Sequence, residues 1–157
     1  MPVKTLKQFL DKEKVKYVSI IHSTAYTAQE VAASAHIPGK ELAKTVIVHL
    51  DGQTAMAVLP ANRKVVLQDL REATGADQVK LVPEEQFKQK FPDCEIGAMP
   101  PFGDEYGVET YVEANLAADE EILIPAGTHE DSVLMAWPDY QRLAKPKVES
   151  FGNHTGA

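Results

Sequence analysis

Two apolar segments joined by an aspartate–glycine pair constrain the fold more than any other stretch of this chain. The segments AKTVIVHL (43–50) and QTAMAVLP (53–60) are both rich in residues that favour β-strands, and Asp51 and Gly52 separate them. An Asp-Gly pair suits the positive φ angles of a two-residue turn. The sequence therefore predicts an antiparallel hairpin over residues 43–60.

The segments around this hairpin predict a mixture of helices and strands. Leu6, Phe9, Leu10 and Val15 recur at helical spacing, which predicts a first amphipathic helix, and YVSIIH (17–22) is a short β-rich run. Helices are also expected over residues 27–36, 66–75, 83–91 and 138–145, strands over 107–114, 121–127 and 132–137, and a frayed tail over 145–157. This order predicts one mixed α/β domain over residues 1–157, not a doubly wound parallel sheet.

Composition narrows the class of protein further. The 157 residues are 44% hydrophobic and 25% charged, which is typical of one globular domain. No apolar run approaches the roughly 18–20 residues that cross a bilayer, so no membrane partner is expected. The single cysteine, Cys94, excludes an internal disulfide, and the histidine spacing predicts no metal site. No other cofactor is expected. These features favour the cytoplasm and leave the oligomeric state open.

The net charge of −7 is unevenly distributed along the chain. Residues 1–92 carry 13 Lys/Arg and 10 Asp/Glu, whereas residues 93–157 carry 3 and 13. A basic patch formed by the first part can therefore coexist with an acidic whole. Solvent-exposed helix surfaces also carry charges of this kind, so charge alone does not predict a nucleic-acid partner.

Lys44 stands near the start of the first hairpin strand, among apolar residues. The two-residue period of a strand places Lys44 and Val46 on one face and Thr45 on the other. An ammonium group among apolar side chains costs free energy unless it reaches water or a partner. Two interpretations follow: Lys44 extends its amine to solvent, or it holds an anion at the mouth of a pocket.

Two further stretches are candidates for chemistry. In GAMPPFG (97–103) the prolines fix φ and lack amide hydrogens, so the loop is stiff, and the amides near Gly97 and Ala98 are expected to be free to bind an oxygen. In PAGTHEDSV (125–133), His129 is expected on a turn between two strands. The alternative for GAMPPFG is a purely structural turn, and the alternative for His129 is an ordinary surface residue. No Ser-His-Asp arrangement is evident.

Together these stretches resemble a known family. A lysine in AKTVIV, then AVLPANRKVVLQDL, then GAMPPFG, then AGTH is similar to the arrangement in the prolyl-tRNA synthetase editing-domain superfamily, which includes the free-standing YbaK/EbsC and ProX-type aminoacyl-tRNA deacylases. The resemblance covers about residues 15–145. It implies a mixed, barrel-like sheet flanked by helices.

The resemblance also implies an activity. Members hydrolyse the ester that joins a wrong amino acid to the terminal adenosine of a tRNA, often tRNA(Pro), and the reaction is thought to lean on the ribose hydroxyl of the substrate. A synthetase pocket built for proline cannot strongly reject smaller amino acids, because the missing apolar contacts are worth only about 1–3 kcal/mol. A second site that hydrolyses the wrong product is therefore useful. The resemblance therefore predicts trans-editing of aminoacyl-tRNA without a cofactor, with prolyl-tRNA synthetase as a possible partner.

Residue roles are carried over position by position. Lys44 matches the essential lysine, expected to hold the phosphate or ribose end of the acceptor. The loop from Gly97 to Pro101 matches the G-x-x-x-P motif, whose amides would face the substrate carbonyl in the same cleft as Lys44. His129 matches the histidine of the G-x-H turn, expected to shape the pocket.

Other positions complete the predicted site. Thr45 stands where the alanine-specific members have asparagine, which leaves the amino acid that is removed undetermined. The pocket wall is expected to include Thr45, His22, Met99, Pro100, Pro101, Phe102 and Gly127. Phosphate contacts with tRNA are expected at Lys40, Arg63 and Lys64. Two alternatives remain: a tRNA- or nucleotide-binding module without turnover, and a hydrolase of small aminoacyl esters that does not use tRNA.

Overall fold

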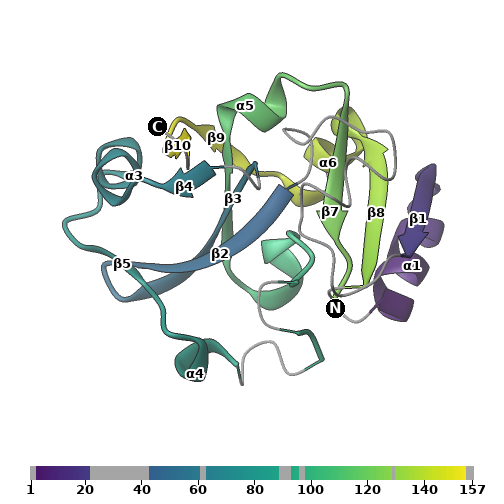
Figure 1. Cartoon of the computed structure of the whole chain (residues 1–157), viewed down its shortest axis with the longest axis horizontal. Coiled ribbons are helices and arrows are strands. Elements are labelled where there is room, and N and C mark those ends of the chain that lie inside the picture. The colour runs from purple at the N-terminus through teal and green to yellow at the C-terminus, as the bar shows by residue number, and fades with distance from the viewer. Residues whose placement is uncertain are drawn as a thin grey trace.

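The predicted hairpin forms the middle of a five-stranded sheet in a computed structural model of the chain, shown in Figure 1. The structure describes residues 3–21, 43–60, 63–88, 93–95, 98–128 and 130–154. Strands β2 (Ala43–Leu50) and β3 (Gln53–Pro60) pair antiparallel along their whole length. Asp51 and Gly52 have φ values of 52° and 84°, so the turn predicted from the Asp-Gly pair is confirmed.

The strands within the described residues form three hydrogen-bonded groups. The five-stranded sheet has the order β5-β2-β3-β6-β9, with β5 (Val79–Leu81), β6 (Glu109–Glu113) and β9 (Lys147–Glu149). A three-stranded antiparallel sheet has the order β1-β8-β7, with β1 (Tyr17–Ile21), β7 (Glu121–Pro125) and β8 (Asp131–Ala136). Strand β4 (Arg63–Val65) pairs with β10 (Gly152–His154). Since β6 is parallel to both β3 and β9, the predicted mixed α/β class is confirmed.

Helices surround the sheets. They are α1 (Val3–Lys12), α3 (Leu67–Thr74), α4 (Glu84–Phe87), the 3-10 helix η2 (Gly103–Tyr106), α5 (Ala114–Ala117) and α6 (Trp137–Ala144). Gly75 ends α3 with a φ of 74°, as its position after an amphipathic run predicts. The helix expected over residues 27–36 lies outside the described residues. Of the helix expected over 83–91, the structure shows α4, which ends at Phe87 with Lys88 in a turn, and residues 89–92 are not described. Among the described residues, no helix is long and apolar enough to span a membrane.

Two apolar cores cover the two faces of the five-stranded sheet. The first core takes Ile47 and Met56 from the hairpin and packs them with α1, α6 and the three-stranded sheet. The second core takes Val48 and Leu59 and packs them under α3. In Figure 1, α1, β1 and β8 lie at one end of the molecule, and α3, β4 and β10 lie toward the other. Alternate residues of β2 therefore point into different cores.

The C-terminal segment is not frayed, so the prediction for residues 145–157 is wrong over 147–154. Phe151 is fully buried in the second core. The amides of Phe151 and Gly152 donate to one carboxylate oxygen of the buried Glu113, at 2.6 and 2.7 Å. A buried carboxylate needs such donors, and no local pattern in the sequence indicates that residues so far apart pair. Residues 155–157 lie outside the described residues.

Candidate active site

The proline loop, residues 98–102, is held in place through its carbonyl groups. Three donors from other parts of the chain bind them: Gly127 N–H to Ala98 O at 2.8 Å, Thr45 Oγ1 to Met99 O at 2.9 Å, and Tyr140 Oη to Pro101 O at 2.7 Å. These donors come from the β7–β8 turn, from β2 and from α6. A loop whose two prolines remove amide hydrogens is thus fixed by partners outside it.

The side chains of the loop are buried. Met99 and Phe102 are each 1% exposed and belong to the first core. The Phe102 ring lies against Phe9 and Tyr140, with centroid distances of 5.6 and 5.4 Å. Met99 and Phe102 were expected in the pocket wall, but their side chains serve as packing that anchors the loop. Pro100 and Pro101 are buried as well.

The amides of the loop differ from what was expected. The Ala98 N–H donates to Glu95 O at 3.0 Å, so it is not the free donor that the sequence suggested. The Phe102 N–H donates to Pro100 O at 2.9 Å. No residue in the described ranges accepts a hydrogen bond from the Met99 N–H. Gly97 lies outside the described residues, and its predicted role stays a prediction.

Lys44 and Thr45 point to opposite faces of the sheet. Thr45 pairs with Val58 of the first core, and its buried hydroxyl binds the proline loop. Lys44 pairs with Leu59 of the second core. Strand β5 pairs with β2 over Val48–Leu50, toward the end of β2 away from Lys44. Thr45 rather than Lys44 therefore contacts the loop, and a cleft shared by Lys44 and the loop stays a prediction.

The surroundings of Lys44 disfavour its charged form. Partial burial lowers the pKa of the Lys44 amine, and the positive charge of Lys64 lowers this pKa further. No carboxylate in the described part of the chain is among the causes of this shift. Neighbouring cations attract anions, and a nucleic-acid phosphate is one such anion.

Comparison with solved structures supports the fold. A crystal structure of a candidate trans-editing enzyme for prolyl-tRNA synthetase superposes with a TM-score of 0.83 at 15% identity, covering 96% of each chain. A hypothetical protein superposes with a TM-score of 0.81 at 17% identity, covering 94% of this chain and 99% of that one. A candidate signal-transduction protein from Marinobacter aquaeolei gives 0.73 at 19% identity, covering 99% of this chain and 32% of that one.

Comparison of the sequence with family models decides the family. The model described as the aminoacyl-tRNA editing domain matches residues 22–143, well over half of the chain. The chain belongs to this family. The editing domain is accordingly an aminoacyl-tRNA deacylase, and its substrate is an aminoacyl-tRNA. A search of curated proteins found no match.

The turn that carries His129 in the editing domain is only partly described. Gly127 has a φ of 101°, and its amide and carbonyl bind Ala98 and Glu95 respectively. Thr128 Oγ1 donates to Asp131 Oδ2 at 2.6 Å, which closes the turn. The turn and the proline loop are therefore neighbours, as the resemblance implies. His129 itself, like His22 and Lys40, lies outside the described residues.

The predicted tRNA contacts that the structure describes lie together on β4. Lys64 is exposed, Arg63 is partly exposed, and both pair with β10, opposite Asn153 and His154. Strand β4 leads directly into α3. Arg63 and Lys64 therefore lie on the side of the five-stranded sheet that Lys44 faces.

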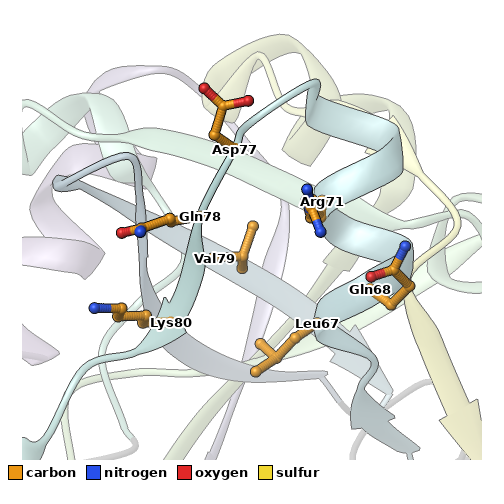
Figure 2. A pocket seen from close by; sticks show the side chains of 7 residues that line it. All are labelled: Leu67, Gln68, Arg71, Asp77, Gln78, Val79 and Lys80. Atoms are coloured by element: carbon orange, nitrogen blue, oxygen red, sulfur yellow. The ribbon is translucent and has the colours of Figure 1, made fainter.

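A shallow groove between α3 and β5 lies next to this region, as Figure 2 shows. Its volume is about 300 Å³, and it is lined by Leu67, Gln68, Arg71, Asp77, Gln78, Val79 and Lys80. In the view of Figure 2, Gln78 and Lys80 extend away from α3, whereas Leu67 and Val79 point toward the space between the two elements. The groove has both signs of charge and no aromatic side chain, so it lacks the stacking surface of a typical base-binding site.

Sequence reasoning missed two of the donors that fix the loop. Tyr140 is fully buried, and its hydroxyl binds a carbonyl 39 residues away. Gly127 was singled out for the pocket wall, but its amide holds Ala98. A tyrosine in a short amphipathic helix gives no local indication of such a contact. The pairing of Tyr140 with the loop could have been proposed only from a three-dimensional arrangement or from covariation.

Proposed function

We propose that the editing domain acts in trans on mischarged tRNA(Pro) and removes an amino acid smaller than proline. The observation that carries this proposal is the proline loop, because its carbonyls are bound by donors from β2, α6 and the β7–β8 turn. A donor held rigidly before the reaction begins stabilises the charge that develops in the transition state. Rigidity of this kind has no evident use in a module that only binds tRNA.

The proposed reaction is hydrolysis of the aminoacyl ester. Water attacks the ester carbonyl carbon, the bond to the ribose oxygen breaks, and a proton from the water reaches that oxygen. The products are the free amino acid and a tRNA with an intact terminal ribose. The amides of Gly97 and Met99, on either side of the hydrogen-bonded Ala98 amide, would stabilise the negative charge on the carbonyl oxygen, and the ribose hydroxyl of the substrate would assist the water.

Lys44 is proposed to anchor the terminal phosphate or ribose of the tRNA. Its amine has the positive charge of Lys64 nearby. Arg63, Lys64 and Lys40 would contact phosphates further along the acceptor. His129 and His22 would shape the space that receives the amino acid. These roles suit an enzyme of the cytoplasm, where tRNAs are charged, with a prolyl-tRNA synthetase supplying the substrate.

A deacylation panel tests this proposal. The purified chain is incubated with tRNA(Pro) charged with alanine, cysteine, serine, threonine or proline, and the free amino acid is measured over time. We expect release of at least one of the four non-cognate amino acids and retention of proline. If all five esters persist while the chain binds the tRNA, the protein is a binding module, and release from aminoacyl-adenosine without any preference for tRNA would indicate a small-ester hydrolase.

A further inference from the structure

The backbone amide of Met99 differs from its neighbours in the proline loop. The amides of Ala98 and Phe102 donate to backbone carbonyls, and Pro100 and Pro101 have none. No residue of the described ranges accepts from the Met99 N–H, although Met99 is 1% exposed. A buried N–H without an acceptor is rare and costs free energy, so it needs an explanation.

The carbonyl of the same residue is held by a side chain of β2. Thr45 Oγ1 donates to Met99 O at 2.9 Å, and Thr45 is 4% exposed. Thr45 lies in the continuous β2–β3 ladder, so its position is set by the centre of the sheet. Thr45 thereby fixes the peptide that follows the Met99 Cα atom. The Met99 N–H belongs to the preceding peptide, whose Ala98 carbonyl accepts from Gly127 N–H at 2.8 Å, so Met99 is held on both sides.

We propose that the Met99 N–H is the donor that binds the ester carbonyl oxygen of the substrate, and that Thr45 is the positioning residue that orients it. This inference rests on the proposed function and names the donor within its site. It also changes the role of Thr45, which would act through the loop and not by contacting the amino acid. The proposal depends on the Thr45 hydroxyl, so serine should replace threonine and valine should not.

Thr110 provides a matched control. It lies on β6, on the same face of the same sheet, and is 5% exposed. Its hydroxyl accepts from Gly103 N–H at 2.9 Å, at the start of η2 and beyond the prolines. Thr110→Val therefore removes one buried hydroxyl and one hydrogen bond, as Thr45→Val does, without altering the support of Met99.

The first test is kinetic. Under single-turnover conditions, Thr45→Val should lower the maximal deacylation rate by about 10- to 100-fold, the cost expected for a small displacement of a catalytic group, with little change in the enzyme concentration giving half that rate. Thr45→Ser should restore most of the rate. Thr110→Val should lower the melting temperature as much as Thr45→Val but keep the rate. Equal rates in Thr45→Val and Thr110→Val would overturn the proposal.

The second test observes the amide directly. The chain has four methionines, so selective ¹⁵N-methionine labelling gives few backbone resonances, and Met56 and Met135 serve as internal references. A 3′-aminoacylamino-3′-deoxyadenosine, in which an amide replaces the ester, is titrated with the amino acid that the wild type releases. The Met99 resonance should shift in the wild type and in Thr45→Ser, and much less in Thr45→Val.

The outcomes separate the two proposals. An unchanged Met99 resonance at saturating analogue overturns the role of Met99 even if deacylation is observed. If the wild type releases none of the four amino acids, the proposed function fails, and the alanyl analogue is then used to read the Met99 resonance by itself. A shift in all three proteins would show that Thr45 does not position the amide.

Discussion

The two sides of strand β2 differ sharply at its first residues. Thr45 is buried, hydrogen-bonded to the proline loop and part of the first core. Lys44, the preceding residue, is partly exposed, faces the second core and has the positive charge of Lys64 nearby. One side has a hydroxyl group that is hydrogen-bonded and fixed, and the other has positive charge on a long side chain.

This difference suggests a division of work within the editing domain. Fixed dipoles are suited to a transition state, because they need no reorganisation when charge develops. Flexible cations are suited to a phosphate backbone, which they attract over a distance and in several geometries. Because successive side chains of β2 point to opposite faces, Thr45 would affect the maximal rate, and Lys44 would affect the affinity for tRNA.

The largest effect on stability is expected from Phe151→Ala. Phe151 is fully buried in the second core and is followed by β10, which pairs with the strand of Arg63 and Lys64. Loss of a buried phenylalanine costs about 3–5 kcal/mol of unfolding free energy. Chemical denaturation should show this loss, whereas Val148→Ala, at a position 37% exposed, should cost far less. A small effect of Phe151→Ala would mean that the C-terminal segment does not support the Lys44 side.

Lys44→Ala is expected to have the largest effect on activity. Loss of a hydrogen bond between charged groups costs about 1.5–3 kcal/mol of binding free energy, so the deacylation rate at a low enzyme concentration should fall about 10- to 150-fold. Deacylation assays should show this loss, with Lys44→Arg retaining part of the activity because the charge remains. The melting temperature should not fall, since the burial of the ammonium is unfavourable. Unchanged activity in Lys44→Ala would remove the anchoring role.

Tyr140→Phe tests the support of the loop from α6. The variant leaves the buried Pro101 carbonyl without its donor, which costs about 1–3 kcal/mol of unfolding free energy. Tyr17→Phe is the matched control, because the Tyr17 hydroxyl makes one hydrogen bond to Asp11 at the surface. Thermal unfolding should separate the two variants clearly. Equal, small losses would contradict the view that the loop is held by buried hydrogen bonds.

The smallest expected effect is the pH dependence that Lys44 adds to stability. Because the folded-state pKa lies below its usual value of 10.5, the unfolded chain binds this proton more tightly. The charged Lys44 amine therefore destabilises the folded state. This effect is fully present below the folded-state pKa and disappears as the pH rises through the usual pKa of 10.5. Relative to Lys44→Met, the wild type should gain stability over that alkaline range. The gain should be about 0.5 kcal/mol or less, because solvent screens a half-exposed group. A loss of relative stability there would have the wrong sign.

Sequence reasoning succeeded where local patterns dominate. The Asp51-Gly52 turn, the helix that ends at Gly75 and the alternation that separates Lys44 from Thr45 all follow from properties of neighbouring residues, and the structure agrees with them. The family resemblance placed the turn at Gly127 and the proline loop in one site, and these segments are indeed hydrogen-bonded to each other.

The errors concern contacts between residues far apart in the chain. The C-terminal segment was expected to fray because chain termini are often poorly ordered, but Glu113 binds its amides from 38 and 39 residues away. Likewise, Ala98 was expected to have a free amide, since a loop sequence does not reveal that the Glu95 carbonyl turns back onto it. Such pairings depend on the assembled fold, and local propensity does not encode them.

The division between rate and binding is tested most directly by single-turnover deacylation measured over a range of enzyme concentrations. The account predicts that Lys44→Ala requires a much higher enzyme concentration for half-maximal rate, and that Thr45→Val lowers the maximal rate at nearly unchanged half-maximal concentration. The same change in both parameters for both variants would contradict it, because the two sides of β2 would then act as one.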